Sequence, residues 1–263
     1  MLLTRVLSTL ILAPIAIGLI WIGGWPFFSL LAFLLSLGAY EFAHLMKQSG
    51  FHLPLLFSII LILVLLLDAL LPQVGLLRPV IAFILLSSLT WQLGHRYNTP
   101  TADWALALAG GLYLGVAGAH LLLLRQLANG ERWLLLTLAG AWLADTGAYL
   151  IGSWLGRHKL APSLSPKKTW EGLMGGVVIG ISLNPIAAAA LGLPAIHGAI
   201  LGAVGATVGT LGDLSISMIK RQAGAKDSGH LIPGHGGVLD RLDSLLFAAI
   251  AGYYYVTWIA RVA

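Results

Sequence analysis

Residues 202–221, GAVGATVGTLGDLSISMIKR, join an apolar run to a polar end and place a glycine at every third or fourth position. An α-helix turns by about 100° per residue, so these glycines share one face that carries no side chains. In membrane proteins such a face usually lets a second helix pack closely. The end of the same helix carries three polar side chains on one face, those of Asp213, Ser217 and Lys220. They form either a structural ion pair or part of a binding site. The glycines are Gly202, Gly205, Gly209 and Gly212.

The composition of the whole chain agrees with a membrane protein. Of its 263 residues, 58% are hydrophobic and only 10% are charged, and its mean hydropathy is +0.90. Soluble domains carry roughly a quarter of charged residues. The chain has no cysteine, which excludes disulfides, zinc-thiolate sites and thiol nucleophiles. We therefore expect an all-α fold, a polytopic helical bundle in a membrane.

Apolar windows follow one another along the chain with short polar breaks. A membrane-spanning helix needs about 20 apolar residues. We count nine windows of this kind, two of which, 54–71 and 79–94, are short enough that one of them could be re-entrant. The predicted spans are 6–23, 25–44, 54–71, 79–94, 102–124, 133–155, 171–192, 196–216 and 243–261.

The basic residues predict the orientation of this bundle. Cytoplasmic loops of membrane proteins carry an excess of lysine and arginine. With a cytoplasmic N-terminus, the loops 156–170 and 217–243 both face the cytoplasm and hold most of the charge. The inner side then carries Arg5, Lys47, Arg96, Arg157, Lys159, Lys167, Lys168, Lys220, Arg221, Lys226 and Arg241. The outer side carries Arg78, Arg125, Arg132 and Arg261.

The two halves of the chain differ in their polar residues. We interpret residues 1–130 as transmembrane scaffold helices, in which acidic residues such as Glu41 and Asp68 are structural or snorkelling side chains. Residues 131–263 supply further transmembrane helices and the cytoplasmic loops of a candidate site. In this half, Asp145 falls inside a predicted span, where an unpaired carboxylate costs about 3 kcal/mol on insertion scales. Asp145 is therefore either bonded to a neighbouring helix or loop lysine, or exposed to a polar cavity.

A cationic loop follows at residues 156–172, GRHKLAPSLSPKKTWEG. Pro166 restricts Ser165 to extended geometry, and Lys167, Lys168 and Thr169 come directly after it. Ammonium groups and a hydroxyl on a stiff loop suit a phosphate. Anchoring to anionic lipid headgroups, worth about 1 kcal/mol per basic residue, is the alternative.

The second polar loop leads into the last predicted helix. Its segment LIPGHGG, residues 231–237, forms a turn with little side-chain bulk, which lets backbone amides approach an anion. Asp240 and Asp243 then lie three residues apart, so on a helix they can point at one site. Carboxylates at this range favour a hard divalent cation between them, and Asp213 could complete its ligands. Carboxylates, basic residues and a glycine turn together predict phosphoryl or nucleotidyl transfer.

These residues also carry a resemblance to a known family. The run from Ser217 to Asp243, SMIKRQAGAKDSGHLIPGHGGVLDRLD, resembles the signature of the phosphatidate cytidylyltransferases, also called CDP-diacylglycerol synthases. The segments DTGAY, at 145–149, and SPKKTWEG, at 165–172, are similar to family motifs in the expected order. The motifs cover roughly the last half of the chain. The resemblance implies a magnesium-dependent transfer of CMP from CTP to phosphatidic acid, which gives CDP-diacylglycerol and pyrophosphate.

The resemblance and the spacing together assign roles to individual residues. The expected catalytic residues are Lys226, Asp227, His235, Asp240, Arg241 and Asp243. The expected substrate-binding residues are Ser165, Lys167, Lys168, Thr169, Glu171, Asp145, Ser217, Lys220, Arg221, Gly236 and Gly237. The expected metal ligands are Asp213, Asp240 and Asp243.

The expected cofactor is Mg²⁺, and whether a second cation such as K⁺ shares the site stays open. The expected partners are CTP, phosphatidic acid in the bilayer and other membrane lipids, with no nucleic acid. The glycine-faced helices are compatible with a homodimer. We expect the protein to be integral to the bacterial cytoplasmic, or inner, membrane, with its active site facing the cytoplasm.

Two other functions fit part of the pattern. A CDP-alcohol phosphotransferase would also place aspartates and Mg²⁺ at a cytoplasmic membrane face, but its usual signature ends in carboxylates spaced four apart. A transporter for cations or phosphate would usually carry polar residues near the membrane midplane and on both sides. Here they gather at one face.

Overall fold

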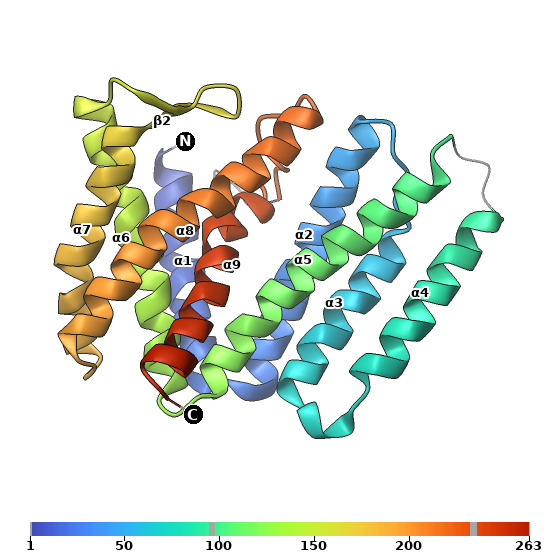
Figure 1. The fold of residues 1–263 in the computed structure, drawn as a ribbon, viewed down its shortest axis with the longest axis horizontal. Coiled ribbons are helices and arrows are strands. Elements are labelled where there is room, and N and C mark those ends of the chain that lie inside the picture. Colours follow the sequence, from blue (N-terminus) through green and yellow to red (C-terminus); the bar gives the residue numbers. More distant parts are fainter. Residues whose placement is uncertain (1, 95–97, 232–235, 263) are drawn as a thin grey trace. The chain divides into compact units, whose positions relative to one another are not determined.

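The computed structural model describes residues 2–94, 98–231 and 236–262, and the side chains from Leu10 onward within these ranges (Figure 1). Nearly every described element is a helix, as the composition predicts. The helices are α1 (Leu2–Ile22), α2 (Gly24–Gln48), α3 (Leu55–Leu70), η1 (Pro72–Val74), α4 (Leu77–Leu93), α5 (Pro100–Gln126), α6 (Gly130–Leu155), α7 (Trp170–Ala190), α8 (Ala195–Gln222), α9 (Leu239–Tyr254) and η2 (Tyr255–Ile259).

The long helices support an integral membrane protein. Six helical segments of the described chain are long and apolar enough to cross a membrane, and α9 counts among them together with η2. The apolar part of α1 (Leu10–Ile22), α3 and α4 are shorter than such a span. Each of the predicted windows falls on a helix, but the count of nine membrane spans is not confirmed and stays a prediction.

A small hairpin interrupts the helices within the cationic loop. Its strands, β1 (Lys159–Ala161) and β2 (Ser165–Thr169), pair in antiparallel register with Lys159 opposite Thr169. The extended geometry that Pro166 predicts for this segment is therefore confirmed. Because side chains alternate along a strand, Lys167 and Lys168 point to opposite faces of β2.

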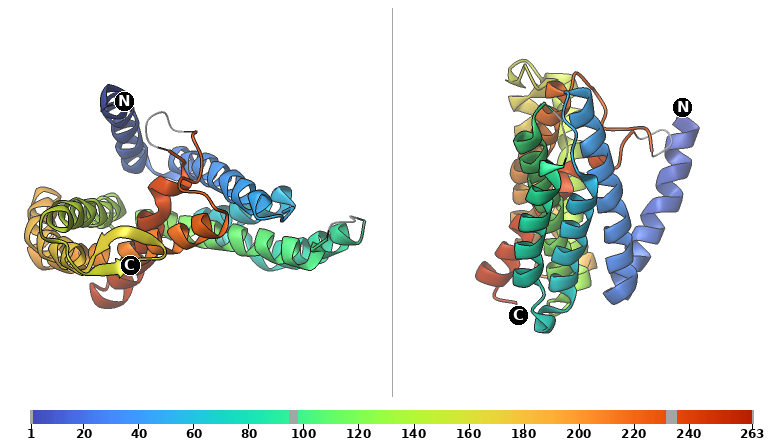
Figure 2. Two further views of the ribbon diagram at one scale, coloured as in Figure 1. Left: turned by 90° about the horizontal axis from the view of Figure 1, so that it is seen from above. Right: turned by 90° about the vertical axis from the view of Figure 1, so that its right-hand side faces the viewer.

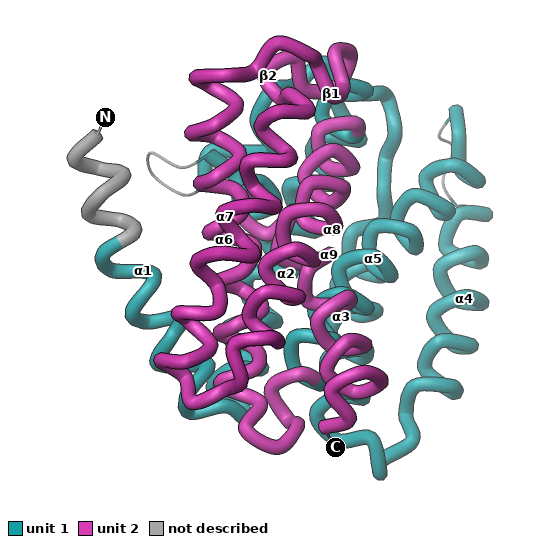
Figure 3. Tube along the Cα trace, turned by 60° about the vertical axis from the view of Figure 1, so that its left-hand side comes forward, with its two compact units in different colours: residues 1–123, 219–240 teal, residues 124–218, 241–263 magenta. Residues whose placement is uncertain are grey.

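The chain forms two compact units (Figure 3). Unit 1 contains residues 1–123 and 219–240, and unit 2 contains residues 124–218 and 241–263. The segment 219–240 carries most of the signature and belongs to the unit built by the N-terminal helices. The predicted division into a scaffold, 1–130, and a catalytic part, 131–263, concerns function and stays a prediction.

Within unit 1, the helix α3 lies beside α2 and α4 (Figure 2). Leu35 of α2, Ile62 and Leu66 of α3, and Leu114 of α5 are all buried. Glycines let α5 approach this layer closely, since a Cβ atom on Gly115 would lie 3.1 Å from the Ile62 Cα. The backbones of α3 and α5 therefore approach each other closely at this point.

The glycine face of α8 has the role that its spacing predicts. A Cβ atom on Gly202 would overlap the backbone of Gly180 in α7, and one on Gly205 would lie 2.6 Å from the backbone of Gly140 in α6. Gly212 touches the backbone of α9 at Asp243 in the same way. The bare face thus lets α8 pack against α6, α7 and the part of α9 in unit 2, and it brings Asp213 near Asp243.

Replacing Gly202 by valine should destabilise the protein, because the new side chain would overlap the α7 backbone. Overpacking of this kind costs about 1–3 kcal/mol. We expect the melting temperature of the protein in detergent to fall by several degrees. Gly18→Val is the matched control, since a Cβ atom on Gly18 would meet nothing within 4 Å. Equal melting temperatures for the two variants would contradict the packing described for α8.

Candidate active site

Unit 2 gathers a group of polar side chains from four elements. We call Asp145 of α6, Lys168 of β2, Asp213 and Ser217 of α8, and Ser244 of α9 the aspartate–lysine cluster. The Lys168 Nζ lies 2.7 Å from the Asp213 Oδ2. Ser217 donates a hydrogen bond to the Asp213 Oδ1 at 3.2 Å, and Ser244 donates one to the Asp145 Oδ2 at 3.2 Å. The Asp145 carboxylate also interacts electrostatically with both Lys168 and Asp213.

The local structure explains why these groups meet. Asp213 and Ser217 lie one helical turn apart on α8, and the alternation of β2 turns Lys168 toward them while Lys167 is exposed. The side chains of Lys168 and Asp213 remain 24% and 33% exposed, so the protein does not enclose the pair. A water-soluble phosphate compound could therefore reach the cluster and compete for the ammonium group.

The carboxylates of the cluster suit a cation, and its one ammonium group suits a phosphate. Two carboxylates, Asp145 and Asp213, share one ammonium group, Lys168, so the cluster carries an excess of negative charge. Carboxylate oxygens are the donors that Mg²⁺ prefers. Among the described residues, however, no three histidine or acidic side chains are arranged as a metal site. The predicted ligand set of Asp213, Asp240 and Asp243 stays a prediction.

The signature residues of unit 1 form a separate network. We call residues 223–238, between α8 and α9, the signature loop, of which 223–231 and 236–238 are described. The Lys220 Nζ lies 2.6 Å from the Asp240 Oδ1. The Asp240 Oδ2 accepts hydrogen bonds from the backbone N–H groups of Ser228 at 2.8 Å and Gly237 at 3.2 Å. Asp240 thus holds the signature loop on both sides of residues 232–235.

Other predicted residues have structural partners of their own. Thr169 is buried, and its Oγ1 caps α7 by accepting the Gly172 N–H at 3.1 Å. The Glu171 carboxylate accepts the Arg157 N–H at 3.1 Å and pairs with the His158 ring at 2.5 Å. These contacts fix the base of the hairpin. The predicted substrate contacts of Thr169 and Glu171 stay predictions.

The remaining predicted residues differ in exposure. Asp243 is buried, and its Oδ1 accepts the Ser244 N–H at 2.7 Å. Arg221 donates to the Ala225 carbonyl at 3.1 Å. Ser165 is half-buried in β2, and Gly236 is half-buried in the signature loop. The exposed residues are Lys167, Arg221, Lys226, Asp227 and Arg241. His235 lies outside the described residues.

Three polar residues of these networks were missed by the sequence interpretation. Ser244 joins the aspartate–lysine cluster, and Ser228 joins the Asp240 network. Glu41 of α2 also contacts the signature loop, and it is buried rather than snorkelling. A carboxylate within an apolar helix was the signal for Glu41, but nothing local in the sequence indicates its partners.

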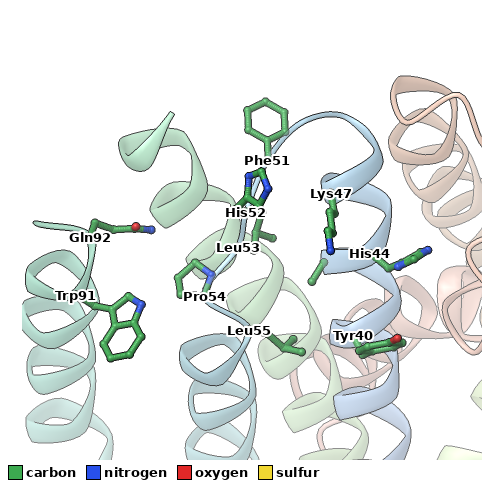
Figure 4. Close-up of a pocket in the computed structure, with 11 residues that line it drawn as sticks. Tyr40, His44, Lys47, Phe51, His52, Leu53, Pro54, Leu55, Trp91 and Gln92 are labelled. Carbon is green, nitrogen blue, oxygen red and sulfur yellow. The ribbon is translucent and has the colours of Figure 1, made fainter. Parts of the chain in front are cut away.

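Unit 1 also contains an open cavity of about 440 Å³ at the ends of α2 and α4 (Figure 4). Its lining combines aromatic, basic and amide side chains, and none of the predicted site residues lines it. The polar part of the lining includes Tyr40, His44, Lys47, His52 and Gln92. The cavity is therefore distinct from the residues that carry the signature.

Comparison with known proteins agrees with the motifs. The model of the cytidylyltransferase family matches residues 3–259. A phosphatidate cytidylyltransferase of Synechocystis sp. is 37% identical over 286 aligned residues, which cover 96% of this chain and 95% of the relative. One of Brucella suis is 34% identical over 96% of this chain and 92% of the relative. One of Mycobacterium bovis is 42% identical over 130 residues, which cover 49% of this chain and 42% of the relative. With a match that extends over nearly its whole length, the chain belongs to the cytidylyltransferase family.

Proposed function

We propose that this protein is a phosphatidate cytidylyltransferase, which transfers CMP from CTP to phosphatidic acid and releases pyrophosphate. The observation that carries the proposal is the similarity over 96% of the chain to relatives with this name. The aspartate–lysine cluster agrees with it, because its partly exposed groups offer an ammonium group to a phosphate and carboxylates to a cation. The product, CDP-diacylglycerol, is a precursor for phospholipid synthesis.

In the proposed reaction, a phosphate oxygen of phosphatidic acid attacks the α-phosphorus of CTP. The new P–O bond forms as the bond between the α-phosphorus and the bridging oxygen breaks, and pyrophosphate leaves with that electron pair. The nucleophile needs no general base, because a phosphate monoester with a second pKa near 6 is already largely dianionic at pH 7. The protein therefore has to position and neutralise charges rather than remove a proton.

Lys168 is the residue that we expect to exchange partners during this reaction. Its ammonium group pairs with Asp213 in a partly exposed position, where an ion pair contributes only about 0–1 kcal/mol. A triphosphate offers Lys168 more negative charge than one carboxylate does. Lys168 can then bind the substrate, while Asp213 becomes available to a cation.

The proposed cofactor is Mg²⁺, which would neutralise the charge that develops on the phosphates and the leaving pyrophosphate. Asp213 and Asp243 suit this ion, because they are hard oxygen donors on two helices that touch at Gly212. Asp145 supplies another carboxylate beside Asp213. A contribution from Asp240, and a second cation such as K⁺, remain proposals from the sequence.

We also propose a location and an orientation. The apolar helices and the bacterial relatives support a protein integral to the cytoplasmic membrane of a bacterium. The basic residues in and around the hairpin favour the cytoplasmic side for the cluster, where CTP is present. A homodimer remains compatible with the glycine-faced helices.

Asp213→Asn should abolish most of the activity, because the substitution removes a charge that holds Lys168 and would hold Mg²⁺. We expect kcat/KM to fall by about 100-fold or more. The assay is pyrophosphate release by detergent-purified protein given CTP and phosphatidic acid, over a range of Mg²⁺ concentrations. Asp68→Asn, in α3 of unit 1, is the control and should keep wild-type turnover. Wild-type protein that releases no pyrophosphate would refute the proposed function.

The two neighbouring lysines of β2 should differ in importance. Lys168→Met removes the ammonium group that contacts Asp213, whereas Lys167→Met alters the exposed face of the strand. We expect the KM for CTP to rise tenfold or more in Lys168→Met, a loss of about 1.4 kcal/mol or more in binding free energy. In Lys167→Met, we expect the KM to change less than threefold, or by less than about 0.6 kcal/mol. Steady-state kinetics with CTP as the varied substrate measure this. Equal losses would show that the orientation of β2 does not select between the lysines.

A further inference from the structure

Glu41 occupies an unusual position for an acidic residue. It lies in the apolar helix α2, and its side chain is only 2% exposed. A carboxylate without water is stable only when donors from the protein replace its hydration. The neighbours of Glu41 therefore define what this residue does.

Three donors from the end of the chain surround the Glu41 carboxylate. The Oε1 atom accepts the Val238 N–H at 2.9 Å. The Oε2 atom accepts the Leu239 N–H at 2.9 Å and the Ser228 hydroxyl at 2.9 Å. The partners lie at least 187 positions from Glu41 in the sequence. Glu41 therefore joins the N-terminal helices to the signature loop and to the first turn of α9.

The chemistry of these contacts requires a carboxylate. All three partners donate, so both oxygens have to accept, which an ionised carboxylate does and an amide cannot do. The N–H groups of Val238 and Leu239 lie at the start of α9, where N–H groups have no partner within the helix and where the helix dipole favours a negative charge. Glu41 thus caps α9 from another helix.

The glycines of the signature loop make this approach possible. A Cβ atom on Gly229 would lie 2.5 Å from the Glu41 Oε1, and a Cβ atom on Gly237 would lie 2.5 Å from the Oε2. A side chain at 229 would displace the Glu41 carboxylate from its donors, and one at 237 would also overlap the Ser228 hydroxyl and lie 2.7 Å from the Gly229 N atom. Glycine at both positions therefore leaves the space that this network occupies.

Ser228 links this contact to the Asp240 network. Its hydroxyl donates to Glu41, while its backbone N–H donates to Asp240 at 2.8 Å. Asp240 also accepts the Gly237 N–H and pairs with Lys220. The two carboxylates therefore fix the described parts of the signature loop on both sides of residues 232–235.

We propose that Glu41 is a positioning residue of the transferase, which holds the signature loop and the first turn of α9 in the geometry that nucleotidyl transfer requires. This inference rests on the proposed function. Glu41 acts through Ser228, Val238 and Leu239 and does not touch the substrates. Its loss should therefore lower kcat through the loop, in addition to any effect on stability.

The experiment compares Glu41→Gln with a matched buried carboxylate. Asp103 of α5 is fully buried in the same unit, and its Oδ1 accepts the His52 N–H at 2.8 Å, away from the signature loop. Asp103→Asn therefore controls for the loss of a buried negative charge. Each protein is examined by pyrophosphate release and by hydrogen–deuterium exchange of peptides covering 223–245, without substrate.

We expect Glu41→Gln to lower kcat by 10-fold to 100-fold, with faster exchange in 223–245. Asp103→Asn should keep kcat within threefold and leave exchange in 223–245 unchanged, even if its melting temperature falls. Ser228→Ala keeps the two backbone contacts of Glu41, so it should fold and lose less kcat, about twofold to tenfold. In the double variant Glu41→Gln/Ser228→Ala, the fold-reduction in kcat should be smaller than the product of the two single reductions, because the two residues act through one contact.

Three results would overturn the proposal. The first is that Glu41→Gln keeps wild-type kcat and wild-type exchange. The second is that Asp103→Asn loses as much kcat as Glu41→Gln and shows the same faster exchange. If Glu41→Gln does not fold, then Ser228→Ala with wild-type kcat and exchange overturns it. Failure of the proposed function is recognised separately, because wild-type protein would then release no pyrophosphate. The exchange measurement would still test whether Glu41 holds the signature loop.

Discussion

A buried carboxylate has to obtain its hydrogen bonds from the protein, and this constraint organises the polar network around the signature loop. Three acidic side chains within helices each contact a distant segment. Glu41 binds the signature loop, Asp240 binds that loop on both sides of residues 232–235, and Asp145 binds Ser244 of α9. The carboxylates thus position the polar segments between the helices, which apolar packing alone would leave unspecified.

The networks differ in how easily their partners can be exchanged. Glu41 is buried among backbone and hydroxyl donors, and leaving a buried polar group without its partner typically costs about 1–3 kcal/mol, and more for a charged group. Asp213 pairs with the flexible side chain of Lys168 in a partly exposed position, where the pair is worth about 0–1 kcal/mol. The Glu41 contact therefore suits a permanent anchor. The Lys168–Asp213 pair suits a site whose groups must change partners when a substrate or a cation binds.

The sequence predicted those features that depend on local patterns. Apolar length located the helices, the glycine spacing of α8 predicted its close packing, and Pro166 predicted the extended segment that became β2. It also indicated that Asp145 needs a partner. It could not predict the role of Glu41, because the donors are mainly backbone N–H groups almost 200 positions away, and a backbone N–H has no sequence signal. The predicted metal site depends in the same way on distances that no local pattern supplies.

In the described part of the glycine turn and at the start of α9, backbone amides donate to carboxylates of the protein itself. The prediction that amides of the turn approach a substrate phosphate stays a prediction, since residues 232–235 lie outside the described residues. The small residues of the turn predicted that backbone amides approach an anion, and a phosphate of the substrate was the expected anion. In the structure, the amides of Gly237, Val238 and Leu239 donate to the carboxylates of Asp240 and Glu41. An amide that already donates to a buried carboxylate has little left to offer a phosphate. Glycine at 237 is therefore explained by contacts within the protein, with the Ser228 hydroxyl, the Glu41 carboxylate and the Gly229 N–H. Recognition of the substrate by side chains such as Lys168 stays a proposal.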